Sequence, residues 1–212
     1  MVRFSYALSV IIFTSKSVIV LSAHVYKKGL RVLGISESFR KGISKNSVLA
    51  GVVMRTDQII DGFVFSQTEV GGMDATQKVI EMYHSLKRDD INILLLNGCV
   101  ISWYNIIDLN FVAGACGVPL ICVTYKDSGG LDSFFKENFP DDWQRRIDVY
   151  KRNGVRKLLK LHTGYDIYVR FLNIDEKDVL PFMNKITIQG AVSEPLRIAR
   201  LLARALMKNF EA

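Results

Sequence analysis

A short run of apolar residues, 91–97, constrains the fold of this chain more than any other segment. The run has the length of one strand, contains no proline, and leads into an Asn-Gly turn signal at Asn97 and Gly98. A strand that is apolar at nearly every position is typical of a sheet buried on both faces in α/β proteins. Residues 31–37 are predicted to form a second buried strand beside it. We therefore expect an α/β domain built around these two strands.

Small and polar residues end both strands, with Ser36 and Glu37 on one and Asn97 and Gly98 on the other. In open α/β sheets, ligands usually bind just beyond the carboxyl ends of the strands. The sequence therefore predicts a site at these strand ends, and leaves open whether that site is active.

The chain carries 28 Lys and Arg against 21 Asp and Glu, a net charge of +7. This balance suits a polyanion such as DNA or RNA, and it equally describes a solvated basic surface. Cys99, Cys116 and Cys122 are odd in number and form no CxxC pair, so a zinc site or a disulfide framework is not expected. Unpaired cysteines fit a reducing compartment, and we expect a cytoplasmic protein.

Residues 1–27 differ from the rest of the chain, because they are rich in Val, Ile and Ser and nearly free of acids. A signal peptide and a membrane span are two interpretations, but Lys16 interrupts the apolar stretch in both. The third interpretation, which we prefer, is an N-terminal extension in front of a domain of residues 28–212. No membrane association is expected, and the sequence does not indicate an oligomeric state.

From residue 28 onward, strand-like and helix-like segments follow in a regular order. Apolar periodicity and turn signals predict antiparallel strands at 47–54 and 59–68, a helix that begins near Asp74, helices at about 103–115, 131–139, 142–153 and 175–184, strands at 118–125 and 165–171, and a final helix from about 193. Three early strands, a helix, and then parallel strands interleaved with helices describe the ribonuclease H-like arrangement, a mixed sheet flanked by helices. In that fold, acids from the first strand, the following helix region and the central strand gather two divalent metals about a phosphodiester.

Several segments resemble the signature blocks of an archaeal family: residues 34–37, 72–76, 96–98, 105–108 and 194–199. That family is catalogued as domain of unknown function family 99, or uncharacterised protein family 0215, and is also discussed as endonuclease dU. It is similar to endonuclease V, which nicks nucleic acids beside deaminated bases. The resemblance covers residues 28–210 and implies a nuclease that acts on DNA near deoxyuridine or a similar lesion.

The resemblance implies Glu37, Asp74, Asn97 and Asp108 as catalytic residues, with the first three as ligands of Mg²⁺ or Mn²⁺. Two positions depart from the family pattern, because Ser36 and Asn97 stand where the family usually has Asp. An Asn oxygen can ligate a metal but brings no charge, so metal affinity should fall.

Each of these residues also has a purely structural interpretation. Ser36 and Glu37 can simply end a strand, and Asp74 can cap a helix. Asn97 with Gly98 is a common turn. Asn105 and Asp108 are three residues apart, so on the predicted helix they would share a face, directed either to the strand ends or to water.

Basic residues near the C-terminal half are the candidate nucleic-acid contacts. Arg197 and Arg200 lie on the final helix, and Arg156 and Lys157 belong to a denser basic cluster near Gly154. The first pair can equally belong to the solvated side of an amphipathic helix, and the second to a mobile loop.

Two functions follow from these residues. The first is an endonuclease V-like, metal-dependent nuclease that binds nucleic acid, DNA more than RNA. The alternative is a catalytically degenerate nucleic-acid-binding or scaffold protein of the same fold, supported by Ser36 and Asn97. A small-ligand binder that uses the strand-end crevice is a weaker third hypothesis.

Overall fold

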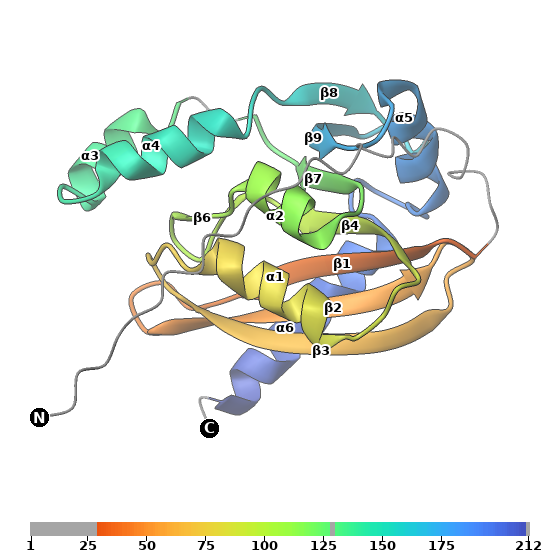
Figure 1. Ribbon diagram of the computed structural model, residues 1–212, viewed down its shortest axis with the longest axis horizontal. Coiled ribbons are helices and arrows are strands. Elements are labelled where there is room, and N and C mark those ends of the chain that lie inside the picture. The colour runs from red at the N-terminus through yellow and green to blue at the C-terminus, as the bar shows by residue number, and fades with distance from the viewer. Residues whose placement is uncertain (1–28, 128–129, 211–212) are drawn as a thin grey trace, which may run out of the picture.

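A seven-stranded mixed sheet runs through the computed structural model, which describes residues 29–127 and 130–210 (Figure 1). In order across the sheet, the strands are β3 (Ile60–Glu69), β2 (Asn46–Arg55), β1 (Arg31–Ser38), β4 (Ile91–Asn97), β7 (Leu120–Thr124), β9 (Asp166–Leu172) and β8 (Lys157–Lys160). β1, β4 and β7 run parallel to one another, and the other neighbours are antiparallel. The expected N-terminal extension, residues 1–27, lies outside the described residues.

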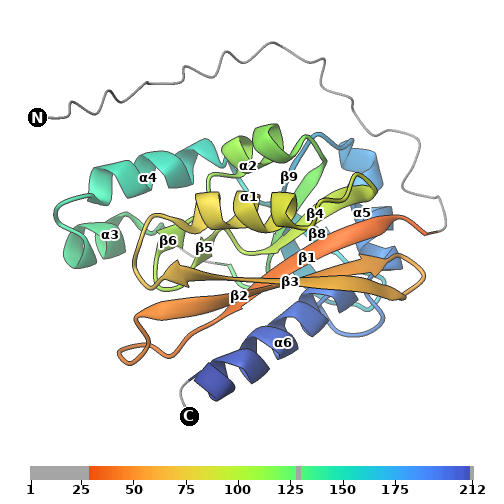
Figure 2. The same cartoon turned by 60° about the horizontal axis from the view of Figure 1, so that its bottom comes forward.

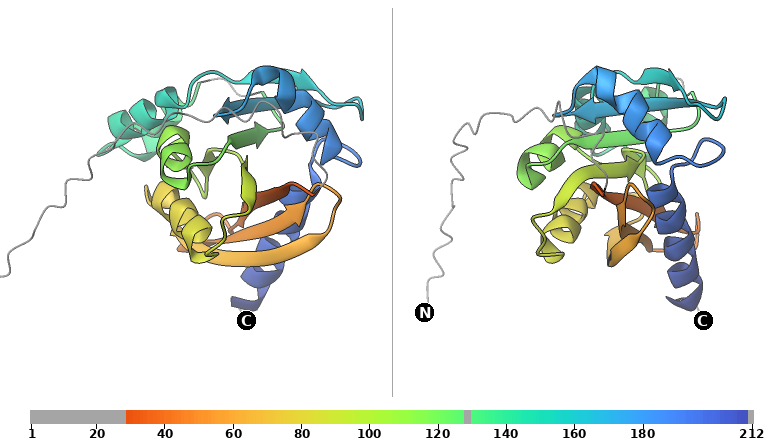
Figure 3. Two further views of the ribbon diagram at one scale, coloured as in Figure 1. Left: turned by 45° about the vertical axis from the view of Figure 1, so that its right-hand side comes forward. Right: turned by 90° about the vertical axis from the view of Figure 1, so that its right-hand side faces the viewer.

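The helices form layers on both faces of this sheet (Figures 2 and 3). α1 (Ala75–Ser85) and α2 (Leu109–Cys116) cover one face. On the other face, α6 (Glu194–Phe210) packs on β1 and β2, and α5 (Glu176–Lys185) packs on the strands beyond β4. α3 (Asp132–Asn138) and α4 (Trp143–Arg152) pack against each other beyond the ends of the central strands.

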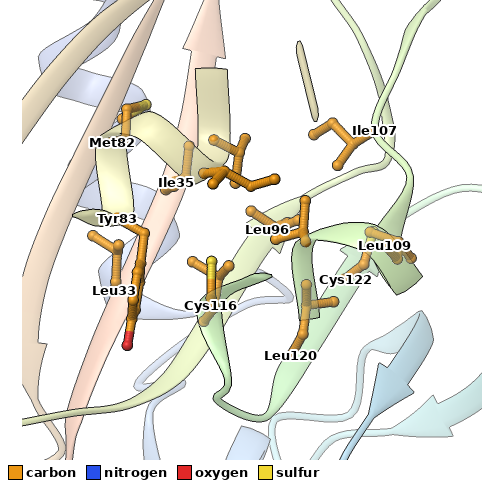
Figure 4. Packing of buried hydrophobic residues seen from close by; sticks show 14 of the residues in the cluster. Leu33, Ile35, Met82, Tyr83, Leu96, Ile107, Leu109, Cys116, Leu120 and Cys122 are labelled. Atoms are coloured by element: carbon orange, nitrogen blue, oxygen red, sulfur yellow. The ribbon is translucent and has the colours of Figure 1, made fainter. Parts of the chain in front are cut away.

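Alternate residues of the central strands feed two separate cores. Leu33, Leu94 and Leu96 pack with α1 and α2 (Figure 4), whereas Ile93 and Leu95 pack on the α5 and α6 side. A strand directs successive side chains to opposite faces, so a strand covered on both sides must be apolar throughout. The continuous apolar run that predicted a central strand is explained by this double coverage.

The predicted helix at 103–115 is wrong in its first half. Val100–Ile101 (β5) and Asn105–Ile106 (β6) form a small hairpin instead, and α2 begins only at Leu109. The turn residues Ser102, Trp103 and Tyr104 have φ values of 44°, 56° and 68°, which a right-handed helix cannot contain. The Trp103 ring packs on Phe139, with ring centroids 5.4 Å apart, so tertiary contacts override the helical spacing here.

The basic cluster near Gly154 is partly strand, not loop. Lys157–Lys160 forms β8, which pairs antiparallel with β9 at the edge of the sheet. Its four residues, Lys-Leu-Leu-Lys, do not alternate between polar and apolar, so the sequence pattern does not separate this short strand from a solvated loop. Among residues 29–127 and 130–210, no helix is long and apolar enough to cross a membrane.

Candidate functional site

Ser36 and Asn97 lie side by side at the tips of the two parallel strands that the sequence singled out. Ile35 is in register with Leu96, so Ser36 and Asn97 are the next residues along β1 and β4. The Asn97 side chain faces the α5 and α6 side of the sheet. Strand alternation places it on the same side as Leu95, and both Leu95 and Val123, the neighbour of Asn97 on β7, belong to the core on that side. Ser36 is buried, and its Oγ donates to the carbonyl of Leu196 in α6, 3.2 Å away. Two neutral side chains therefore occupy the adjacent strand tips.

Glu37 points to the opposite face of the sheet from Ser36. Its Oε2 accepts hydrogen bonds from Ser47 Oγ at 2.8 Å and Ser102 Oγ at 3.0 Å. These hydroxyls tie the tip of β1 to β2 and to the turn of the β5–β6 hairpin. The space left between the tips of β1 and β4 is a cavity of about 10 Å³, which is roughly the room that one water needs.

Asp74 stands at the start of α1, but its carboxylate does not cap that helix. Oδ1 accepts from Thr68 Oγ1 at 2.6 Å and from Asn105 Nδ2 at 2.7 Å, and the backbone N–H of Glu69 also points to the carboxylate. Burial alone would raise the pKa of Asp74, but these hydrogen bonds outweigh it and hold the pKa below its ordinary value. The hydrogen bonds of Asp74 therefore link the end of β3 to the start of α1.

Asn105 is the centre of this network, a role that sequence reasoning did not assign. It is fully buried, and its Nδ2 also donates to the carbonyl of Glu69 at 2.9 Å. Its Oδ1 accepts from the backbone N–H of Ala75 at 3.1 Å, so Asn105 satisfies a donor at the start of α1. The only sequence signal was its place in the block at 105–108, because the contact crosses from the hairpin to a helix thirty residues earlier.

Asp108 caps α2 and does not share a helix face with Asn105. Its Oδ1 accepts from the backbone N–H of Phe111 at 3.1 Å, and its Oδ2 pairs with Arg152 at 3.0 Å. An aspartate that accepts from the third residue onward is a common N-cap. The structure therefore gives Asp108 a local role at the start of α2.

The chemistry of these donors does not fit a pair of divalent cations. Mg²⁺ prefers several hard anionic oxygens in octahedral geometry, but Ser36 and Asn97, which lie side by side on their strands, offer only neutral oxygens. The carboxylates of Glu37 and Asp74 are each held by hydrogen-bond donors of the protein. Within the described ranges, no three His, Cys, Asp or Glu residues come together as a possible metal site.

A basic cleft opens at the ends of β4 and β7, with a volume of about 620 Å³. We call it the strand-tip cleft; the residues that matter here are Asn97, Tyr125, Lys126, Arg156, Arg170 and Arg200. Arg200 reaches it from α6 and is exposed, whereas Arg170 is buried in its wall. The Tyr125 hydroxyl is buried and has no hydrogen-bond partner among the described residues, and burial raises its pKa.

A second hollow of about 420 Å³ adjoins this cleft and shares Tyr150, Arg156 and Arg170 with it. We call it the tyrosine pocket, because Tyr150 and Tyr168 both line it. The Arg156 guanidinium lies over the Tyr168 ring at 5.1 Å, and that of Arg170 lies over the Tyr150 ring at the same distance. Cleft and pocket together combine aromatic surfaces with positive charge.

The structure brings together only some of the predicted site residues. Asn97, Arg156 and Arg200 meet in the strand-tip cleft. Lys157 lies on β8 and forms an ion pair with Glu176, and Arg197 forms one with the buried Glu194. The two tyrosines and Arg170 were not singled out, because they come from α4 and β9 and meet only in the folded chain.

Comparisons with known proteins agree with this fold. The family described as endonuclease dU matches residues 28–207. A UPF0215 protein of Pyrobaculum calidifontis is 36% identical over 172 residues, which cover 81% of this chain and 93% of the relative. One from Pyrococcus furiosus is 28% identical and covers 86% of this chain and 95% of its own length.

Solved structures show the same arrangement. A protein of unknown function from Archaeoglobus fulgidus superposes with a TM-score of 0.71 at 24% identity, covering 84% of this chain and 98% of that one. Ciona intestinalis endonuclease V, in complex with a 24mer DNA containing an inosine followed by a ribo-adenosine, gives a TM-score of 0.61 at 15% identity, covering 87% and 89%. The predicted ribonuclease H-like, endonuclease V-like fold is confirmed.

Proposed function

Because this chain belongs to the endonuclease dU family, we propose that it binds nucleic acid in the strand-tip cleft and has lost metal-dependent hydrolysis. One observation carries the proposal: Arg156 and Arg200 line a single cleft together with the neutral Asn97, which stands at a strand tip where the family resemblance implies an acid. The described residues that line the cleft thus include positive side chains that suit a phosphate backbone, and no carboxylate that would hold a metal there.

The charge of the cleft suits a phosphate backbone. Lys126 and Arg200 are exposed at its edge, and the whole chain has a net charge of +7. Each Lys or Arg that contacts a phosphate releases counterions, so binding should weaken steeply with salt. Arg156 also pairs with Asp127 at 3.0 Å, which fixes its guanidinium on the cleft wall.

The tyrosine pocket favours unpaired nucleotides over a regular duplex. Tyr150 and Tyr168 are partly exposed there, and aromatic side chains bind bases that have left the helical stack. The Ciona endonuclease V structure contains DNA, so DNA is the first nucleic acid to test. Three free cysteines, all buried, agree with the reducing cytoplasm as the place where this binding occurs.

The second candidate is a metal-dependent endonuclease that nicks DNA near deaminated bases such as deoxyuridine. Family membership favours it, together with the retained acids Glu37 and Asp74. Hydrolysis would then need Mg²⁺ or Mn²⁺ held without the two strand-tip carboxylates. We place it second because Ser36 and Asn97 lie side by side and neither carries charge.

Fluorescence anisotropy with labelled oligonucleotides tests the binding. We expect the full chain to bind single-stranded DNA, and Arg200→Glu to weaken this binding by roughly tenfold, since a phosphate contact becomes repulsive. Arg145→Glu is the matched control, because Arg145 is exposed on α4 and lines a different hollow. No measurable affinity, or equal losses in both variants, would overturn the proposed site.

A nicking assay separates the two candidates. Duplexes and single strands that carry deoxyuridine or deoxyinosine are incubated with the protein and Mg²⁺ or Mn²⁺, and the products are separated on denaturing gels. We expect intact strands at protein concentrations that saturate binding. Nicking that is lost in a Glu37→Ala, Asp74→Ala double variant would establish the nuclease instead.

A further inference from the structure

β3 is an open edge of the sheet. It is the outermost strand next to β2, and no other described strand pairs with its outer side. The two ends of β3 are already bonded, because the Glu69 backbone bonds with Asp74 and Asn105 and the Asp61 carbonyl accepts from Arg88. The backbone N–H and C=O groups between these ends can accept another strand. Proteins usually protect such an edge with proline or lysine, and Ile60–Glu69 contains neither.

Large apolar side chains stand along this edge. Phe63 is 46% exposed and Phe65 is 48% exposed, and their rings stack with centroids 6.5 Å apart. Val64, between them, packs into the core under α1, so the two rings face the α6 side of the sheet. α6 packs on β1 and β2 (Figure 2), and the Phe63 and Phe65 side chains on β3 remain about half exposed.

We propose that a second copy of this chain covers the edge, with the two β3 strands paired antiparallel about a two-fold axis at Val64. An interface of this kind is self-complementary, because the same patch serves both copies and the assembly closes at two. It satisfies the hydrogen-bonding groups that remain free in the middle of both strands, and it makes one continuous sheet.

The side chains of β3 agree with this register. An axis at Val64 places Phe63 opposite the partner's Phe65, so four aromatic rings meet on the α6 side. Cross-strand aromatic pairs stabilise sheets by about 0.2–1 kcal/mol each.

The charges on β3 agree as well. Asp61 falls opposite the partner's Gln67, and Glu69 lies beyond the paired segment because its backbone is bonded to Asp74 and Asn105, so no acid faces an acid. The Asp61 carboxylate is already neutralised by Arg31, 2.6 Å away.

The proposed dimer leaves the strand-tip cleft free. The cleft lies at the ends of β4 and β7, and β1 and β2 separate these strands from β3 in the sheet. The dimer would thus present two clefts, and its existence does not depend on whether the cleft binds nucleic acid.

Sedimentation velocity of the full chain over a range of concentrations tests the dimer. We expect a monomer–dimer equilibrium in the wild type. F63K/F65K and F63E/F65E should each be monomeric, because each places like charges opposite one another across the axis. An equimolar mixture of the two variants should form a heterodimer, because every lysine then faces a glutamate.

F111K/F134K is the matched control, since Phe111 and Phe134 are 52% and 49% exposed elsewhere on the surface. It should dimerise like the wild type, and all variants should give the wild-type circular dichroism spectrum. A wild type that stays monomeric, dimers that survive in F63K/F65K, or a mixture that fails to associate would each overturn the proposal.

Discussion

Gly34 lies directly against Pro195, and there is no space between them for a side chain. A Cβ on Gly34 would come within 2.7 Å of the Pro195 Cβ and 2.9 Å of its carbonyl carbon. The first turn of α6 thus rests on the backbone of β1, two residues before Ser36. This contact favours glycine at position 34, because a larger residue there would overlap the first turn of α6.

Gly34→Ala should therefore destabilise the protein by about 1–3 kcal/mol, as overpacking of a rigid contact does. Urea unfolding measures the free energy of unfolding. Gly114→Ala is the control, because Gly114 lies in α2 with open space around it, and alanine there should be neutral or stabilising by up to about 1 kcal/mol. Equal effects of the two changes would refute the close contact.

Asp74 should make stability depend on pH. Its pKa in the folded protein lies below the ordinary value of 3.8, so the unfolded state takes up its proton first as the pH falls. The contribution is therefore complete above about pH 4 and is lost as the pH falls through the folded pKa. Asp74→Asn should remove this loss and so flatten the stability profile below about pH 4. Urea unfolding across this range measures it, with Asp141→Asn as the control for removing one exposed acid.

Arg146 should be needed for the loop that carries Asp74. Its side chain is buried, donates to the carbonyls of Gly71, Gly72 and Tyr104, and pairs with Asp142 at 2.7 Å. Lysine cannot reproduce this planar fork, so Arg146→Lys should leave carbonyls unpaired and cost about 3 kcal/mol. The exposed neighbour change Arg145→Lys should stay within about 0.5 kcal/mol. Chemical denaturation of both variants provides the comparison.

The sequence predicted the sheet well because each of its central strands is covered on both sides. Double coverage requires the apolar runs around Leu33 and Leu95, and such runs are visible without coordinates. The hairpin at Trp103 was missed because its turn is fixed by packing on Phe139, a contact between distant segments. Apolar spacing cannot show such a contact.

Only part of the candidate site could be predicted from the sequence, because the rest depends on contacts between distant segments. Asn97 could be found because strand ends are marked by an abrupt change in polarity. The directions of Ser36 and Glu37 depend on which face of β1 each occupies, and one residue of offset decides it. The tyrosine pocket requires α4, β9 and the segment after β7 to meet, which no local pattern encodes.

Restoring acids at the two strand tips should create a metal site. Ser36 and Asn97 lie side by side, so Ser36→Asp, Asn97→Asp would place two carboxylates together where the wild type has two neutral side chains. Without metal, this double variant should be less stable than the wild type, because like charges repel and the hydrogen bond from the Ser36 hydroxyl to Leu196 would be lost. Mn²⁺ should reverse that loss, since a ligand that binds only the folded state stabilises it.

Thermal melts with and without Mn²⁺ measure this reversal, and electron paramagnetic resonance of Mn²⁺ measures binding directly. Each single variant should respond less, because one carboxylate holds a divalent cation weakly. The wild type should show no shift. If Mn²⁺ stabilised the wild type as much as the double variant, then Glu37 and Asp74 would already hold the ion, and the nuclease would become the better proposal. If Mn²⁺ did not change the melting temperature of the double variant, the two strand tips would not face a common space.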